Sequence, residues 1–125
     1  MKHIFVLLIL LNSALGYAQT AEFNFLNPTT HDWDQVDEGV QLKHYFIFEN
    51  SGNVPLVIDD AMVSCGCTKV EFPKNPILPN HTDSILVRFD TKNKYYRQDR
   101  IIKLKANTQR AQKLRIKAYV IPYPE

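Results

Sequence analysis

The chain has 125 residues, of which 45% are hydrophobic and 22% are charged, and its formal net charge is +2. This length suits one compact domain and is too short for two, and the composition of an ordinary globular protein excludes a disordered chain. The charge is unevenly distributed: residues 19–90 carry four basic and eleven acidic side chains, and residues 91–125 carry ten basic and two acidic. A folded domain should therefore be electrically polarised.

The first eighteen residues have the pattern of a secretion signal. A short, positively charged start precedes the apolar run Ile4–Leu11, and small residues, ending with Ala18, occupy the positions that a signal peptidase reads. The run is far shorter than the roughly 17 residues that cross a bilayer as a helix. We predict that residues 1–18 are a cleaved signal peptide. Residues 19–125 would then be one exported domain, periplasmic or extracellular, with no transmembrane anchor.

Period-two alternation of apolar and polar residues predicts short strands and no helix in the mature chain. The expected strands, in chain order, lie around Phe23–Phe25, His31–Val36, Leu42–Phe48, Pro55–Ile58, Thr68–Phe72, Ile85–Phe89, Ile102–Ala106 and Leu114–Val120. Seven or eight short strands at regular spacing are typical of an immunoglobulin-like Greek-key β-sandwich, with a small open barrel as the alternative. We expect the last five residues to leave the sheet, because their prolines lack a backbone donor.

Both cysteines of the chain, Cys65 and Cys67, flank Gly66. In an exported protein two cysteines are expected to form a disulfide, but so small a loop contributes only about 1.6 kcal/mol. The purpose of the pair is therefore local: a pinched turn, an exchangeable dithiol, or two sulfur ligands for one metal. In a flat strand the two Cα atoms would lie roughly 6.6 to 7 Å apart, at the limit for a disulfide, and the glycine allows the backbone to fold them closer.

Metal binding by Cys65 and Cys67 would involve Cu(I) or Zn²⁺, and zinc would need two more ligands. The histidines have no diagnostic spacing for that role. His44 shares a face with two phenylalanines and is expected to be a buried, hydrogen-bonded core residue. His31 is expected to cap a strand turn, and His81, in a proline-rich loop, to be solvated.

No sequence motif indicates catalysis. The chain has no glycine-rich phosphate loop, no nucleophile elbow and no metalloprotease helix motif. The paired acids Asp37-Glu38 and Asp59-Asp60 fall in predicted turns, where solvated carboxylates are the ordinary outcome. We therefore predict a protein that is not an enzyme and has no cofactor.

The last two predicted strands place five cations on one outward sheet face. This predicted interaction face, here called the basic face, consists of Lys103, Lys105, Lys113, Arg115 and Lys117. Five cations cannot be buried together, so the face meets water or an anionic partner such as an acidic protein surface or an envelope polyanion. Export and the lack of interleaved aromatic residues argue against nucleic acid.

Six blocks of sequence resemble a widespread family of exported bacterial domains of unknown function, domain of unknown function 1573, which is common in Bacteroidetes. The blocks are His31-Asp32-Trp33, Glu38-Gly39, His44-x-Phe46-x-Phe48-x-Asn50-x-Gly52, Pro55-Leu56-x-Ile58, Ser64-Cys65-Gly66-Cys67-Thr68 and Arg88-Phe89-Asp90-Thr91. The resemblance covers nearly the whole mature chain, and the block with the cysteines is its most specific part. It implies export and a sandwich related to hydin, major sperm protein and PapD-like domains, and it implies no established activity.

The chain departs from the family pattern at positions where such domains usually have glycine. It has Asp34 after the first block, Lys94–Tyr96 after the last block, and Ala118 near the end. These departures concern the shape of loops. The sequence as a whole predicts a non-catalytic binding or assembly module of the bacterial envelope. A thiol-disulfide or copper-handling protein that uses Cys65 and Cys67 is the alternative, and the partner, process and oligomeric state are not indicated.

Overall fold

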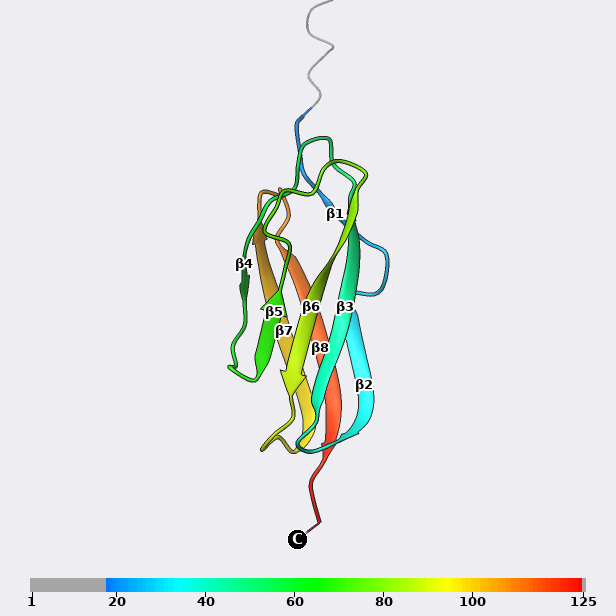
Figure 1. The fold of residues 1–125 in the computed structure, drawn as a ribbon, viewed down its shortest axis with the longest axis vertical. Helices are drawn as coiled ribbons and strands as arrows, with labels where there is room; N and C mark the ends of the chain where they lie inside the picture. The colour runs from blue at the N-terminus through cyan, green and yellow to red at the C-terminus, as the bar shows by residue number, and fades with distance from the viewer. Residues whose placement is uncertain (1–17, 125) are drawn as a thin grey trace, which may run out of the picture.

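The structure is a computed structural model that describes residues 18–124, so the predicted signal peptide lies outside the described residues except for Ala18. Eight strands follow one another along the chain (Figure 1). They are β1 (Phe23–Phe25), β2 (Thr30–Asp37), β3 (Gln41–Asn50), β4 (Ile58–Met62), β5 (Thr68–Glu71), β6 (Thr82–Asp90), β7 (Tyr96–Ala106) and β8 (Gln112–Ile121). The described part of the chain contains no helix, and hence no helix that could span a membrane.

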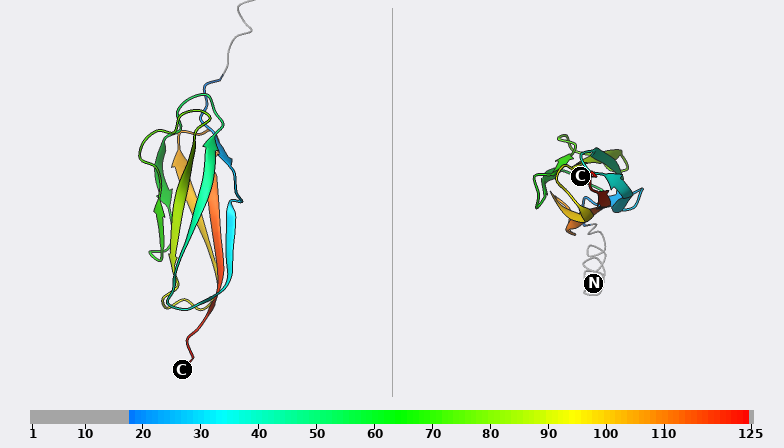
Figure 2. Two further views of the ribbon diagram at one scale, coloured as in Figure 1. Left: turned by 45° about the vertical axis from the view of Figure 1, so that its right-hand side comes forward. Right: turned by 90° about the horizontal axis from the view of Figure 1, so that it is seen from below.

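The strands form two four-stranded sheets, with the orders β1-β3-β6-β5 and β2-β8-β7-β4. We call these the first and the second sheet. Every pairing is antiparallel except that of β2 with β8. The two sheets pack face to face along the length of the molecule, and the view along its long axis shows them enclosing a common interior (Figure 2). The predicted β-sandwich is confirmed.

Alternate residues of the long strands fill the space between the sheets, as the period-two pattern predicts. The first sheet contributes Phe46, Phe48, Ile85, Val87 and Phe89, and the second contributes Ile102, Leu104, Leu114, Ile116 and Ala118, all with at most 6% of their surface exposed. Their outward neighbours are mostly polar. The predicted register of the central strands is therefore confirmed, and it fixes which side chains remain available on the outer faces.

The prediction for the fourth strand is wrong by about three residues. We expected it at Pro55–Ile58, but β4 begins at Ile58 and continues to Met62. Pro55 has no backbone donor for a ladder, and its carbonyl instead accepts a hydrogen bond from the side chain of Asn107 at 3.0 Å. Leu56 makes only an isolated bridge to Ile77.

A β-bulge interrupts β2 where the family pattern has a glycine. Asp34 adopts a positive φ of 59°, in the region that glycine tolerates best, and the pairing of β2 with β8 shifts between Asp32 and Gln35. The Asp32 side chain accepts a hydrogen bond from the backbone N–H of Asp34 at 2.8 Å. Tyr96, in the second segment that departs from the pattern, also has a positive φ, of 63°. Both departures therefore occupy backbone conformations suited to glycine.

Buried polar residues complete both ends of the sandwich. At one end Asn50, fully buried, accepts hydrogen bonds from the backbone N–H groups of Glu22 and Gly52 and donates two to the carbonyls of Val54 and Ile77. Gly52 is required there, because a Cβ atom on it would lie 2.1 Å from the carbonyl oxygen of Thr20. These bonds hold three backbone segments together: those around Glu22, residues 50–54 and Ile77.

The opposite end is organised by Glu38 and Thr91. Glu38 is only 9% exposed, and its carboxylate accepts hydrogen bonds from the backbone N–H groups of Asn93 and Tyr123. The Thr91 hydroxyl is fully buried and lies within hydrogen-bonding distance of the carbonyls of Asp37 and Val40. The expectation of a solvated carboxylate is wrong for Glu38, which instead fixes the β6–β7 turn and the C-terminal segment.

Candidate functional site

Cys65 and Cys67 lie in the connection that crosses from β4 in the second sheet to β5 in the first (Figure 1). The structure joins them in a disulfide, with their Cα atoms 5.2 Å apart. The turn is closed by a hydrogen bond from the N–H of Thr68 to the carbonyl of Cys65 at 3.2 Å. The backbone has thus folded the pair closer together than in a flat strand.

The cysteine turn is anchored on one side only. The carbonyl of Cys67 accepts a hydrogen bond from the N–H of Asp90 at 2.9 Å, and Thr68 pairs with Phe89 in the first sheet. Gly66 is exposed, and no atom lies within 4 Å of the position that a Cβ would take. Reagents in solution can therefore approach this turn from the glycine side.

The described histidines are not grouped with other potential metal ligands. Within residues 18–124, no group of three or more histidine, cysteine, aspartate or glutamate side chains is placed to hold a metal ion. His31 and His44 stack on each other between the sheets, with ring centroids 3.7 Å apart and planes 7° apart. Burial, and secondarily the facing His31, lower the pKa of His44 below its ordinary value of 6.5.

Two of the three expectations for the histidines need correction. His44 is half-buried and stacked, and its side chain makes no hydrogen bond within the described part of the chain. His31 packs inward against Trp33 and His44 instead of capping a turn. The alternation of β2 explains this, because the side chain that precedes exposed Asp32 must point to the interior. His81 is exposed, as expected.

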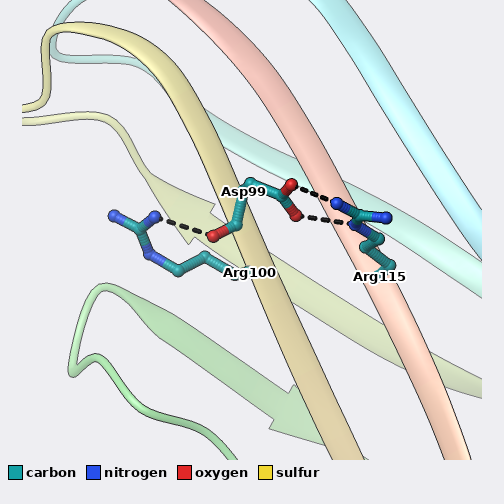
Figure 3. Close-up of polar contacts among 3 residues, drawn as sticks. All are labelled: Asp99, Arg100 and Arg115. Carbon is teal, nitrogen blue, oxygen red and sulfur yellow. Dashed lines mark hydrogen bonds and ion pairs between the residues drawn. The ribbon is translucent and has the colours of Figure 1, made fainter.

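The five residues of the basic face lie on the outer side of the second sheet, where four are exposed and Lys117 is half-buried. They differ in their neighbours. Arg115 forms a two-pronged ion pair with Asp99, shown in Figure 3, and hydrogen bonding to the guanidinium lowers the pKa of that carboxyl group. Lys117 stands opposite Asp99 on one side and Asp32 on the other, and Lys105 stands opposite Asp60. These three cations are locally compensated.

Lys103 and Lys113 are the uncompensated part of the basic face. They stand directly opposite each other on β7 and β8, and neither makes an ion pair within residues 18–124. Like charges directly opposite each other destabilise a sheet. On the outer face of the first sheet Arg88 also has cationic neighbours, but Glu71 pairs with it at 3.4 Å. On the outer face of the second sheet, the cations without a carboxylate opposite are therefore Lys103 and Lys113.

A groove that the sequence does not predict lies beside Lys103. It has a volume of about 650 Å³ and runs between the start of the β4–β5 connection and the adjoining part of β7. It is lined by Met62, Val63, Ser64, Asp99, Arg100, Ile101, Lys103 and Arg115. Met62, Val63 and Ile101 are exposed hydrophobic residues, 48%, 38% and 46% accessible respectively. The sequence contains one local sign of this groove: Ile101 directly precedes the buried Ile102, so alternation along the strand puts a large apolar side chain on the outer face.

Arg100 occupies an inward position on β7, two residues from buried Ile102 and Gln98. Its guanidinium lies 5.8 Å from the ring centroid of Phe89 on the opposite sheet and donates hydrogen bonds to the Gln98 side chain and to the Asp99 carbonyl. Figure 3 shows its side chain extending from β7 on the side away from β8. A cation thus lies at the open side of the sandwich, at the edge of the groove.

Comparison with known proteins supports the fold and the family. The family model described as "Protein of unknown function (DUF1573)" matches residues 22–120. No curated protein matches the sequence. Among solved structures, a protein of unknown function from Porphyromonas gingivalis W83 aligns with a TM-score of 0.72 and 19% identity over 85% of this chain and 50% of its own. The present chain thus spans about half the length of that protein.

Two further solved structures show the same sandwich. A PapD-like domain of human CEP192 aligns with a TM-score of 0.65 and 6% identity over 90% of this chain and 94% of its own. The YadV chaperone aligns with a TM-score of 0.51 and 16% identity over 84% of this chain and 53% of its own. At these identities the likeness concerns the fold alone. The family match covers most of the sequence, and the chain therefore belongs to the DUF1573 family, whose function is unknown.

Proposed function

We propose that this protein is a non-catalytic binding or assembly module of the bacterial cell envelope, exported by its N-terminal segment. It binds an acidic surface of another envelope or extracellular protein, or an envelope polyanion, through the basic face. The observation that carries the proposal is the unpaired juxtaposition of Lys103 and Lys113 on an exposed sheet. This arrangement costs stability in the isolated domain, and an anionic partner would relieve that cost.

Photo-crosslinking in the native bacterium tests this proposal. A photoreactive amino acid placed at Lys103 or Lys113 should give a discrete crosslinked species, and the same group at Lys43 should not. Lys43 is the matched control because it is an exposed lysine on the outer face of the other sheet. Equal crosslinking from all three positions, or from Lys43 alone, would contradict binding through the basic face.

The alternative function, thiol exchange or copper handling, is favoured by one observation: the disulfide lies in a turn that is open on its glycine side. A free-thiol count and metal analysis on protein purified from the periplasm, with and without reductant, separates the two functions. A redox protein should show a mixture of thiol and disulfide, and a copper protein should contain bound metal. A fully oxidised, metal-free pair is the result expected of a binding module.

A further inference from the structure

The backbone of β7 is unpaired along part of one edge. β7 pairs with β8 from Tyr96 to Leu104, but with β4 only from Lys103 to Ala106. Backbone groups in an antiparallel strand alternate between its two edges. The backbone N–H of Asn107, directly after β7, donates to the carbonyl of Val57 on the β4 side, so the backbone N–H and C=O groups of the odd-numbered residues of β7 point to that edge. The N–H and C=O groups of Arg97, Asp99 and Ile101 therefore point to an edge where no strand lies among the described residues.

Only one of these edge groups has a partner within residues 18–124. The carbonyl of Asp99 accepts a hydrogen bond at 3.0 Å from the guanidinium of Arg100, and Figure 3 shows this carbonyl pointing away from β8. An exposed run of unpaired N–H and C=O groups is a template for another strand. Added here, such a strand would continue the line of β4 and extend the second sheet along β7.

The side chains around this edge specify the chemistry of the added strand. Residues of the new strand would alternate between the outer face and the interior of the sandwich. An inward-pointing residue would lie beside Arg100, whose charge has no carboxylate partner among the described residues. An outward-pointing residue would lie in the groove against Met62 and Ile101, which are exposed and hydrophobic. The edge therefore fits an extended segment with a carboxylate on one face and an apolar side chain on the other.

We propose that the protein binds an extended, acidic segment of a partner protein as an additional antiparallel β-strand on the free edge of β7, next to the cysteine turn. This inference rests on the proposed binding function and adds its mode: backbone hydrogen bonds give affinity, and Arg100 with the apolar groove gives selectivity. Lys103, one of the two uncompensated lysines, lines the same groove and favours an anionic chain there.

Amide hydrogen exchange, monitored by NMR on isotope-labelled protein in which the disulfide is intact, tests whether the partner binds as an added strand. The probes are synthetic nonapeptides of alternating valine and threonine with a central glutamate, and the same peptides with glutamine in its place. In the free protein the amides of Arg97, Asp99 and Ile101 should exchange rapidly, whereas those of Gln98, Arg100 and Ile102, bonded to β8, should be protected. The glutamate peptides should protect the three odd-numbered amides and bind about tenfold more tightly than the glutamine peptides.

Arg100→Gln is the specificity variant and Arg88→Gln its control, because Arg88 lies on the outer face of the first sheet. Arg100→Gln should remove the tenfold preference for glutamate and leave the amide protection by either peptide in place. Rapid exchange that no peptide of the set slows, or protection of the odd-numbered amides before any peptide is added, would overturn the strand-addition mode. If the native partner crosslinks at Lys103 while these amides stay unprotected in its presence, the binding function stands and this mode fails.

Discussion

The two ends of the sandwich and the free side of β7 differ in how completely their polar groups are satisfied. At the ends, Asn50, Glu38 and Thr91 are buried and each makes two or more hydrogen bonds. Beside β7, all but one of the edge backbone groups lack a partner within residues 18–124, and the pair Lys103 and Lys113 has no ion pair there. Buried polar groups in a stable fold are hydrogen-bonded within the protein. The exposed groups beside β7 that lack partners are therefore the better candidates for binding another molecule.

The sequence blocks that resemble the family divide between these two kinds of region. Those containing Glu38, Asn50 and Thr91 are accounted for by the two ends, and His31 and His44 of two blocks by packing between the sheets. Only the block around Cys65 and Cys67 lies on the open side, where residues just before it line the groove. Most of the family resemblance therefore reports on the fold, and one block reports on the candidate site.

Among the polar residues of these two regions, the largest effect is expected at the satisfied end that contains Asn50. Asn50→Ala should lower the free energy of unfolding by about 3 kcal/mol or more, because the fully buried side chain is lost and the part-buried backbone groups of Glu22, Gly52 and Val54 lose the hydrogen bonds it makes. Asn27→Ala is the control: its amide also bonds backbone groups, of Tyr45 and Ile47, but near the surface, and should cost about 1 kcal/mol. Urea denaturation measures both. Equal costs for the two variants would refute the role of Asn50 as a buried hub.

A smaller effect is expected from the disulfide. The double variant Cys65→Ser with Cys67→Ser should remain folded and lose at most about 1.6 kcal/mol, because the closed loop is so short. If the variant does not fold, the disulfide is required for the stability of the whole sandwich, which contradicts the local role given to it here. Circular dichroism and thermal melting distinguish these outcomes, and the single variants serve as controls for an unpaired thiol.

Acid should weaken the domain through His44. Its folded-state pKa is lowered, first by burial and then by the facing His31, so the folded protein binds a proton less readily than the unfolded chain does. The contribution is fully present above the ordinary pKa of 6.5 and is lost as pH falls below it. Urea denaturation across that window should show falling stability, abolished by His44→Gln and kept by His81→Gln. A rise in stability on acidification in both variants would contradict this assignment.

The smallest effect on stability is expected at the uncompensated lysines. Lys103→Gln and Lys113→Gln should each leave the free energy of unfolding within about 0.5 kcal/mol, or raise it slightly, because they relieve a like-charge pair. Phe89→Ala, on the inward face of β6, should by contrast cost about 3 to 5 kcal/mol. If the lysine variants unfolded the domain while the phenylalanine variant did not, the strand register would be wrong by one residue.

The sequence predicts most strands and the inward residues, because alternation is a local pattern, but it misses the first half of β7, where the inward positions hold polar Gln98 and Arg100. It does not predict the burial of Glu38, whose partners Asn93 and Tyr123 come 55 and 85 residues later. Nor does it reveal the free edge of β7. That edge exists because β4, the neighbouring strand in the sheet, pairs with β7 only from Lys103 to Ala106. From sequence the basic face is five equivalent cations, and only the register of the strands shows which of them have a carboxylate opposite.

The most direct test of the central claim compares matched charge reversals on the two sheets. Lys103→Glu with Lys113→Glu changes the uncompensated pair, and Lys43→Glu with Lys69→Glu changes exposed lysines of the first sheet by the same amount of charge. The crosslinked complex formed from position 105 in the native bacterium is then quantified for each. We predict that the first variant loses the complex and the second retains it, with recovery decreasing as salt rises. Retention of the complex by the first variant, or its loss from both, would contradict binding through the basic face.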